Sequence, residues 1–155
     1  MIPQLSLGTD GPQIPELGLG CMGMSEFYGE TDDAQSLAVL DRAYELGVRM
    51  FDTADMYGNG HNEALLAQFL KQGRADAFVA TKFGIRKQPG EYARTIDNSP
   101  DYIRQACDAS LKRLGVERID LYYVHRAEAG RDIEDTMGVL ADLVGQSQSA
   151  TGALQ

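Results

Sequence analysis

Cysteine, basic residues and long apolar runs are all scarce in this sequence. It has two cysteines, Cys21 and Cys107, and 14 lysines and arginines against 23 aspartates and glutamates, which gives a net charge of -9 at pH 7. A protein that binds nucleic acid needs a basic surface to neutralise phosphates, so this charge argues against nucleic acid as a partner. The two cysteines lack metal-type spacing, and we expect both to be buried thiols in a reducing compartment.

No stretch of the chain approaches the roughly 18 consecutive apolar residues of a membrane span. The first residues, MIPQLSLG, contain no basic segment followed by an apolar run, which is the pattern of a secretory signal. We therefore expect a cytoplasmic protein that makes no membrane contact. Its 155 residues, 43% of them hydrophobic, suffice for one domain with a core and are too few for two.

Strand-like and helix-like segments alternate along the chain, which predicts an α/β fold with parallel strands. Short apolar segments typical of strands are ELGLGCM, VRMFDTA, AFVATKF and RIDLYYVH. Helical periodicity covers residues 33–46, 62–71, 99–114 and 133–144. Pro100 suits a helix start and Gly115 a helix end, while Asn62 and Glu63 are expected to cap the second helix. Residues 4–16 predict a β-hairpin and residues 83–99 a polar loop.

Gly18, Gly20 and Gly23 spell G-x-G-x-x-G, the motif of a Rossmann dinucleotide-binding turn. In a Rossmann domain the helix begins within the glycine run, and an acidic residue follows about 20 positions later. Here a loop of about ten residues follows the glycines, and Asp52 lies 34 positions after Gly18. The alternative is a (β/α) TIM barrel, in which such glycines let a strand and its exit loop approach a ligand closely. We favour this barrel in an incomplete form, with about four β/α units and an N-terminal β-hairpin cap.

Four polar side chains lie at the ends of the expected strands. Asp52 and Tyr57 belong to FDTADMYG, Lys82 to VATKFG and His125 to LYYVHR. The carboxyl ends of barrel strands meet on one face, so we expect these side chains to form one catalytic site.

The four residue types together favour proton transfer to a carbonyl oxygen. A tyrosine with an ordinary pKa near 10 transfers protons poorly at neutral pH unless a cation such as Lys82 stabilises its phenolate. Asp52 would balance the lysine, and a neutral His125 would orient a substrate oxygen. The set contains no nucleophile paired with a base and no metal ligand group, so another molecule would have to deliver hydride.

Four blocks of the sequence resemble those of the aldo-keto reductase superfamily in order and spacing: GLGCMGMSEFYG, GVRMFDTADMYGNGHNE, VATKFG and SLKRLGVERIDLYYVHR. The resemblance runs from about Leu5 to Val144, and the MSEFYG segment is most similar to the bacterial and plant branch that reduces diverse aldehydes and ketones. It implies NADPH as the cofactor and a small carbonyl compound as the substrate.

The resemblance also implies a role for each candidate residue. Tyr57 would be the general acid, Lys82 would lower its pKa, Asp52 would pair with Lys82, and His125 would orient the carbonyl group. The implied cofactor contacts, beside the nicotinamide, are Gly20, Cys21, Met22 and Asp52.

The chain departs from the family's pattern in its length. A full barrel needs eight strands and roughly 250 residues, and the resemblance implies that the second half holds most of the cofactor. We assign residues 1–144 to the N-terminal half of such a barrel and residues 145–155 to a disordered tail. Suitable codons for Gln-Ser-Gln-Ser, read one base later, encode the Lys-Val-Arg that the family's pattern would continue with. We therefore hypothesise a frameshifted or truncated gene.

An open half-barrel would expose the edges of its first and fourth strands, so we expect self-association. Two functions remain open for such a chain. It is either an NADPH-dependent reductase or a non-catalytic half-barrel that acts as an assembly partner.

Overall fold

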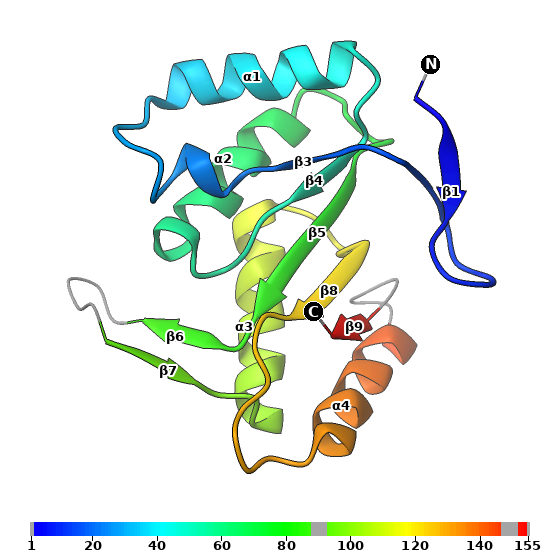
Figure 1. Cartoon of the computed structure of the whole chain (residues 1–155), viewed down its shortest axis with the longest axis vertical. Helices are drawn as coiled ribbons and strands as arrows, with labels where there is room; N and C mark the ends of the chain where they lie inside the picture. The colour runs from blue at the N-terminus through cyan, green and yellow to red at the C-terminus, as the bar shows by residue number, and fades with distance from the viewer. Residues whose placement is uncertain (1, 88–92, 147–151, 155) are drawn as a thin grey trace.

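A parallel sheet forms the centre of the computed structural model, which describes residues 2–87, 93–146 and 152–154 (Figure 1). Its strands lie in the order β3 (Gly18–Gly20), β4 (Met50–Asp52), β5 (Phe78–Phe83), β8 (Leu121–Val124) and β9 (Gly152–Leu154). All neighbouring pairs are parallel, and the order in space is the order in the sequence. A Rossmann sheet reverses its strand order in the middle, whereas a barrel does not. The Rossmann alternative is therefore wrong, and the incomplete barrel is confirmed.

Helices follow the strands as the sequence predicts. Their bounds are α1 (Asp33–Glu45), α2 (His61–Leu70), α3 (Pro100–Leu114) and α4 (Ile133–Gly145). The Asp32 side chain accepts a hydrogen bond of 2.7 Å from the backbone N–H of Gln35 at the start of α1. Gly115 ends α3 with a φ of 67°, a left-handed conformation that suits glycine. The local start and stop signals thus place the helix ends to within a residue or two.

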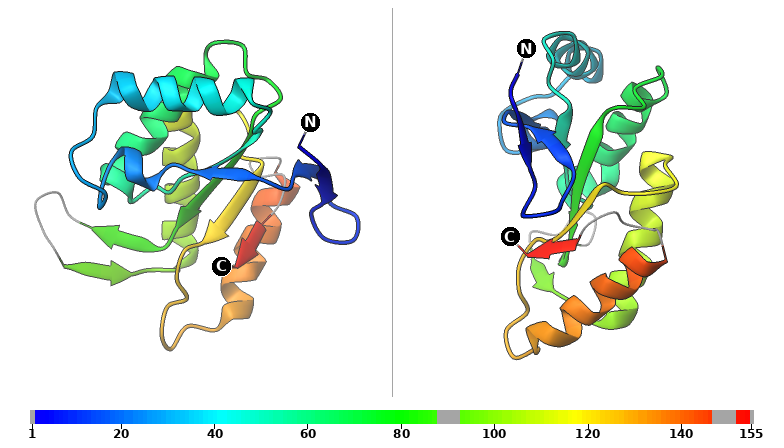
Figure 2. Two further views of the ribbon diagram at one scale, coloured as in Figure 1. Left: turned by 45° about the horizontal axis from the view of Figure 1, so that its top comes forward. Right: turned by 90° about the vertical axis from the view of Figure 1, so that its right-hand side faces the viewer.

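The two faces of the sheet differ in what covers them. Phe51, Val79 and Tyr122 are buried in the main hydrophobic core, together with residues of all four helices. Side chains alternate along a strand, so Asp52 and Lys82 lie on the opposite face. Figure 2 shows α2, α3 and α4 on one side of the strands and the N-terminal hairpin on the other. The helices thus leave free the face that carries the predicted site.

Two antiparallel hairpins flank this sheet. The first pairs β1 (Gln4–Ser6) with β2 (Gln13–Pro15) and confirms the predicted hairpin. The second pairs β6 (Ile85–Lys87) with β7 (Arg94–Ile96), inside the segment that the sequence predicts to be a loop. That prediction is wrong at both arms, because two short polar strands give too few alternating residues to stand out. Residues 88–92 between them lie outside the described residues.

The structure describes only part of the tail that the sequence analysis assigns to residues 145–155. Helix α4 extends to Gly145, and β9 pairs with β8 in a parallel register that aligns Gly152 with Tyr122. Pairing satisfies backbone N–H and C=O groups that the edge of β8 would otherwise leave open. The outer strands of the sheet are therefore β3 and β9. Residues 147–151 and 155 lie outside the described residues.

Within the described ranges, every helix is too short or too polar to cross a membrane.

Candidate active site

Lys82 lies at the centre of the predicted site. It projects from β5, and its side chain is 2% exposed. Its ammonium donates hydrogen bonds to Asp52 Oδ1 at 2.6 Å, to the Thr53 carbonyl at 2.8 Å and to the Tyr57 hydroxyl oxygen at 3.2 Å. A buried ammonium has three protons to place, and these acceptors use all of them. Asp52 also balances the charge, so the lysine is held rigidly beside the tyrosine.

Tyr57 reaches Lys82 because the chain turns sharply after β4. The turn is the short helix η2 (Tyr57–Gly60), in which Gly58, Asn59 and Gly60 all have positive φ angles. Its last residue, Gly60, must be a glycine, because a Cβ atom there would lie 2.6 Å from Arg113 Cδ. The Tyr57 side chain is buried, and its ring centre lies 4.9 Å from Lys82 Nζ. The Tyr57 hydroxyl and the Lys82 ammonium are therefore held in contact, so the charge on one affects the other.

His125 closes the site from the end of β8. Its backbone N–H donates to the Phe83 carbonyl at 2.8 Å, and its ring packs edge-on against Tyr57 with centroids 5.8 Å apart. Burial, and secondarily the positive charge of Lys82, lowers the pKa of His125 to about 4. The imidazole is therefore neutral at physiological pH. Its Nδ1 atom is buried and has no protein partner within the described segments.

The structure thus brings together Asp52, Tyr57, Lys82 and His125, which the sequence places at the ends of three strands. Among the described residues, no cluster of three or more histidine, cysteine or acidic side chains could hold a metal ion. The arrangement offers one phenolic proton donor, one fixed ammonium and one neutral imidazole. Such a set can donate a proton to a substrate oxygen and stabilise the phenolate left behind.

The residues proposed for cofactor contact form the exit of β3. Gly20 aligns with Asp52 across the parallel pair, and the Cys21 backbone N–H donates to the Asp52 carbonyl at 2.8 Å. The Cys21 side chain is buried in the core, and this burial raises its pKa to about 12, so it stays an unreactive thiol. Nothing lies within 4 Å of where a Gly20 Cβ would stand. The chain that leaves the end of β3 therefore has open space beside its backbone, next to Asp52. Met22 lies at the edge of this space.

Asn62 has a role other than the helix cap expected from the sequence. The cap position of α2 is Gly60, and Asn62 is completely buried. Its side chain accepts from the Thr53 hydroxyl at 2.7 Å and donates to the Cys21 carbonyl at 2.8 Å and to Ser25 Oγ at 2.7 Å. Asn62 therefore ties the exits of β3 and β4 to each other, directly behind the residues that hold Lys82.

Glu63 lies in the first turn of α2, where its negative charge is favourable as expected, and it also forms a second buried link. The Thr81 hydroxyl donates to Glu63 Oε1 at 2.7 Å, and Arg113 Nε donates to Oε2 at 2.6 Å. The residue before Lys82 on β5 is thereby joined to α2 and α3.

A signal for Asn62 was present in the sequence: it stands three, four and seven positions before Leu65, Leu66 and Phe69, on the apolar stripe of its helix.

Comparison with known proteins is consistent with this geometry. The family model described as "Aldo/keto reductase family" matches residues 16–146. The chain is 44% identical over 145 residues to the aldo-keto reductase yakc of Schizosaccharomyces pombe, whose name includes NADP(+), and 43% identical to a probable aldo-keto reductase 1 of Glycine max. Each alignment covers 92% of this chain and 42% of the relative.

Solved structures agree. An aldo-keto reductase from Bacillus halodurans, determined in its holo form, superposes with a TM-score of 0.91 and 32% identity. The match covers 100% of this chain and 50% of that one. The glycerol dehydrogenase of Gluconobacter oxydans superposes with a TM-score of 0.85 and 25% identity, over 97% of this chain and 47% of its own. The chain spans less than half the length of the curated relatives it matches, and it belongs to the aldo/keto reductase family of oxidoreductases.

Proposed function

We propose that this chain carries the proton-transfer site of an NADPH-dependent reductase that converts aldehydes and ketones to alcohols. The observation that carries the proposal is the hydrogen bond of 3.2 Å between Lys82 Nζ and the Tyr57 hydroxyl oxygen. Within the described residues no group of histidine, cysteine or acidic side chains could hold a metal ion beside that tyrosine.

The proposed step begins with Tyr57 donating its phenolic proton to the carbonyl oxygen of the substrate. As the proton leaves, negative charge develops on the tyrosine oxygen. The Lys82 ammonium stabilises that charge at short range, and because Lys82 is itself buried, solvent screens its charge little. Asp52 keeps the lysine in place and prevents a net positive charge from accumulating in the site.

His125 orients the substrate. A neutral imidazole carries one N–H that can donate to the carbonyl oxygen while Tyr57 approaches the same atom. Its edge-on packing against the Tyr57 ring fixes the angle between the two groups. The depressed pKa keeps the imidazole from competing with Tyr57 as the proton source.

Gly20, Met22, Asp52 and the Cys21 backbone would hold the nicotinamide end of the cofactor. The open space beside Gly20 fits a flat ring that lies against backbone. When bound, the reduced nicotinamide supplies the hydride. The choice of NADPH over NADH draws support from the yakc relative, whose name includes NADP(+).

A second candidate function rests on the outer edge of β3. Within the described residues this edge pairs with no strand, and Leu17 beside it is 62% exposed. Open edges of this kind pair with other chains. On this alternative the half-barrel acts as an assembly partner, and sedimentation at rising protein concentration would detect the association.

The test of the reductase function compares Tyr57→Phe with Tyr44→Phe in an assay of NADPH consumption with a panel of aldehydes. Both variants remove one phenolic hydroxyl, but Tyr44 lies on α1 and bonds Asp76 at the surface. We expect turnover to fall at least about 100-fold in Tyr57→Phe, the usual worth of a general acid, and to persist in Tyr44→Phe. Equal turnover in the two variants would rule out Tyr57 as the proton donor.

A further inference from the structure

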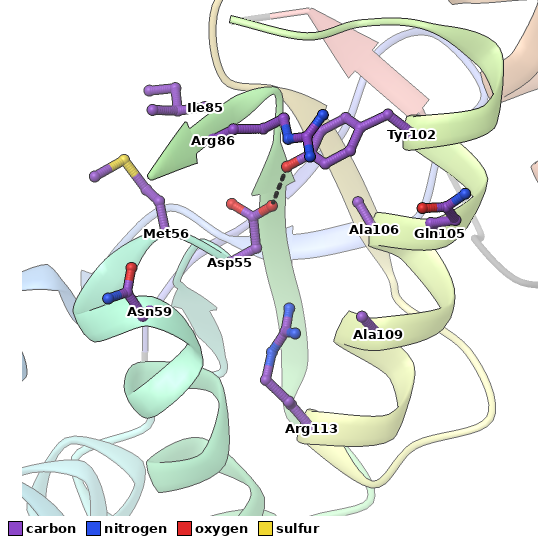
Figure 3. Close-up of a pocket in the computed structure, with 10 residues that line it drawn as sticks. All are labelled: Asp55, Met56, Asn59, Ile85, Arg86, Tyr102, Gln105, Ala106, Ala109 and Arg113. Carbon is purple, nitrogen blue, oxygen red and sulfur yellow. Dashed lines mark hydrogen bonds between the residues drawn. The ribbon is translucent and has the colours of Figure 1, made fainter. Parts of the chain in front are cut away.

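A cavity lies away from the Tyr57 site. It has a volume of about 330 Å³ and opens between α3 and the segment that leads from Asp55 into η2 (Figure 3). Met56, Ile85, Ala106 and Ala109 give it an apolar wall. The Asp55 carboxyl belongs to this cavity, while its backbone N–H donates to the Lys82 carbonyl at 3.1 Å. The cavity is therefore close to the catalytic strand but open to a different side.

Asp55 is poorly satisfied for a buried carboxyl group. Its Oδ1 atom has no hydrogen-bond partner within the described ranges, and its Oδ2 atom accepts only a long bond of 3.5 Å from the Tyr102 hydroxyl. The Met56 backbone N–H gives the group some further support. Burial, and next the charge of Glu63, raises the pKa of Asp55 to about 7. A buried acceptor left open in this way costs stability unless a donor arrives.

The charges around the cavity show which kind of donor is missing. Arg113 and Arg86 both reach its wall, but each already has an acid: Arg113 Nε lies 2.6 Å from Glu63, and Arg86 Nη1 lies 2.9 Å from Asp97. Among the described residues none forms an ion pair with Asp55, although the charge of Arg113 is near enough to act on it. With Asp55 ionised, the charged groups around the cavity carry one more negative than positive charge, and a bound cation would balance them.

We propose that this cavity binds a small organic monocation: a primary ammonium group on a short alkyl chain. The ammonium would lie at the Asp55 carboxylate, and a rotation of that side chain would bring the buried, unpartnered Oδ1 atom into contact with it. The alkyl chain would lie along Met56, Ile85 and Ala106, whose surfaces favour apolar groups. The Tyr102 ring beside Asp55 already has the Arg86 guanidinium over it, with Cζ 5.1 Å from the ring centre, so the Asp55 carboxylate would be the main partner of the cation.

The test is a calorimetric titration of the full chain with n-butylammonium at pH 8, with n-butanol as the uncharged counterpart. We expect saturable binding of the amine and at least about tenfold weaker binding of the alcohol, because only the amine neutralises Asp55. Binding should weaken about tenfold or more at pH 5.5, where Asp55 is protonated.

Three variants separate the cavity from general effects of charge. Asp55→Asn should weaken amine binding at least about tenfold, whereas Asp101→Asn, at an exposed position on α3, should leave it unchanged. Ala109→Leu narrows the cavity without touching the carboxyl group and should also weaken binding. Circular dichroism shows whether each variant is folded. Equal binding by the wild-type chain and Asp55→Asn would overturn the proposal, as would no saturable binding to the folded wild-type chain.

Discussion

Buried polar residues carry more of the site's geometry than their positions in the sequence suggest. Lys82 and Tyr57 were identifiable because each lies near the end of a strand, but the atoms that hold them in place belong to Asn62, Thr53 and Asp52. These bonds cross from one β/α unit to the next. The reacting groups were therefore predictable, while the support that fixes their distances was not.

Asn62→Ala should destabilise the chain by about 1–3 kcal/mol, since it removes three hydrogen bonds and leaves the buried Thr53 hydroxyl without its partner. Gln68→Ala on the exposed face of the same helix is the control and should stay within about 0.5 kcal/mol. Urea unfolding followed by circular dichroism measures both. Equal losses would show that the Asn62 bonds contribute nothing beyond helix propensity.

Asp55 makes stability depend on pH in an unusual direction for a carboxyl group. Its pKa is raised to about 7 in the fold, against 3.8 as the ordinary value. The folded chain therefore binds the Asp55 proton more tightly than the unfolded chain does. The resulting gain in the free energy of unfolding is complete below pH 3.8 and is lost as the pH rises through 7. The side chain in Asp55→Asn cannot ionise. The free energy of unfolding of this variant, relative to that of the wild-type chain, should therefore be higher at pH 8 than at pH 4. Unfolding titrations of both chains at the two pH values test this, and a constant difference would contradict it.

At the scale of elements, helix ends are where sequence and structure agree best. Pro100 and Gly115 bound α3 as predicted, because a fixed φ and a left-handed residue act locally. The start of α2 was misassigned, because its cap is Gly60 and the polar residues after it point into the core. The difference arises because burial of Asn62 and Glu63 depends on β3, β5 and α3, which no local pattern reveals.

Gly60→Ala and Gly115→Ala separate backbone strain from steric clash. Both glycines have positive φ, but a Cβ atom at Gly60 would lie 2.6 Å from Arg113 Cδ, and one at Gly115 meets nothing within 4 Å. We expect about 1 kcal/mol of destabilisation for Gly115→Ala and distinctly more for Gly60→Ala, since Arg113 must also leave Glu63. Thermal unfolding of the two variants gives the comparison, and an equal loss in both would rule out the clash.

At the scale of the whole molecule, the sheet is an open arc and not a closed barrel. Its outer strands are β3 and β9, and within the described residues neither has a partner on its outer side. The face that carries Lys82 is the one left uncovered by helices. We therefore propose that chains associate through the β3 edge.

Leu17→Lys should reduce self-association, because a charged side chain beside β3 opposes pairing at that edge. Leu46→Lys is the control, since Leu46 is similarly exposed, at 60% against 62% for Leu17, but lies at the end of α1. Analytical ultracentrifugation over a range of protein concentrations measures the shift. An equal effect of both substitutions would mean that general charge, and not the edge, controls association.

The sequence by itself determined the α/β class, the alternation of strands and helices, and the strand-end positions of Asp52, Lys82 and His125. Each of these follows from apolar periodicity and from glycine and proline signals, which act within a few residues of chain. The tertiary structure alone decided the pairing of β9 with β8, the β6–β7 hairpin, the burial of Asn62 and the unmatched charge of Asp55. Those features depend on which distant segments meet, because a hydrogen bond or an ion pair exists only where folding brings both partners into contact.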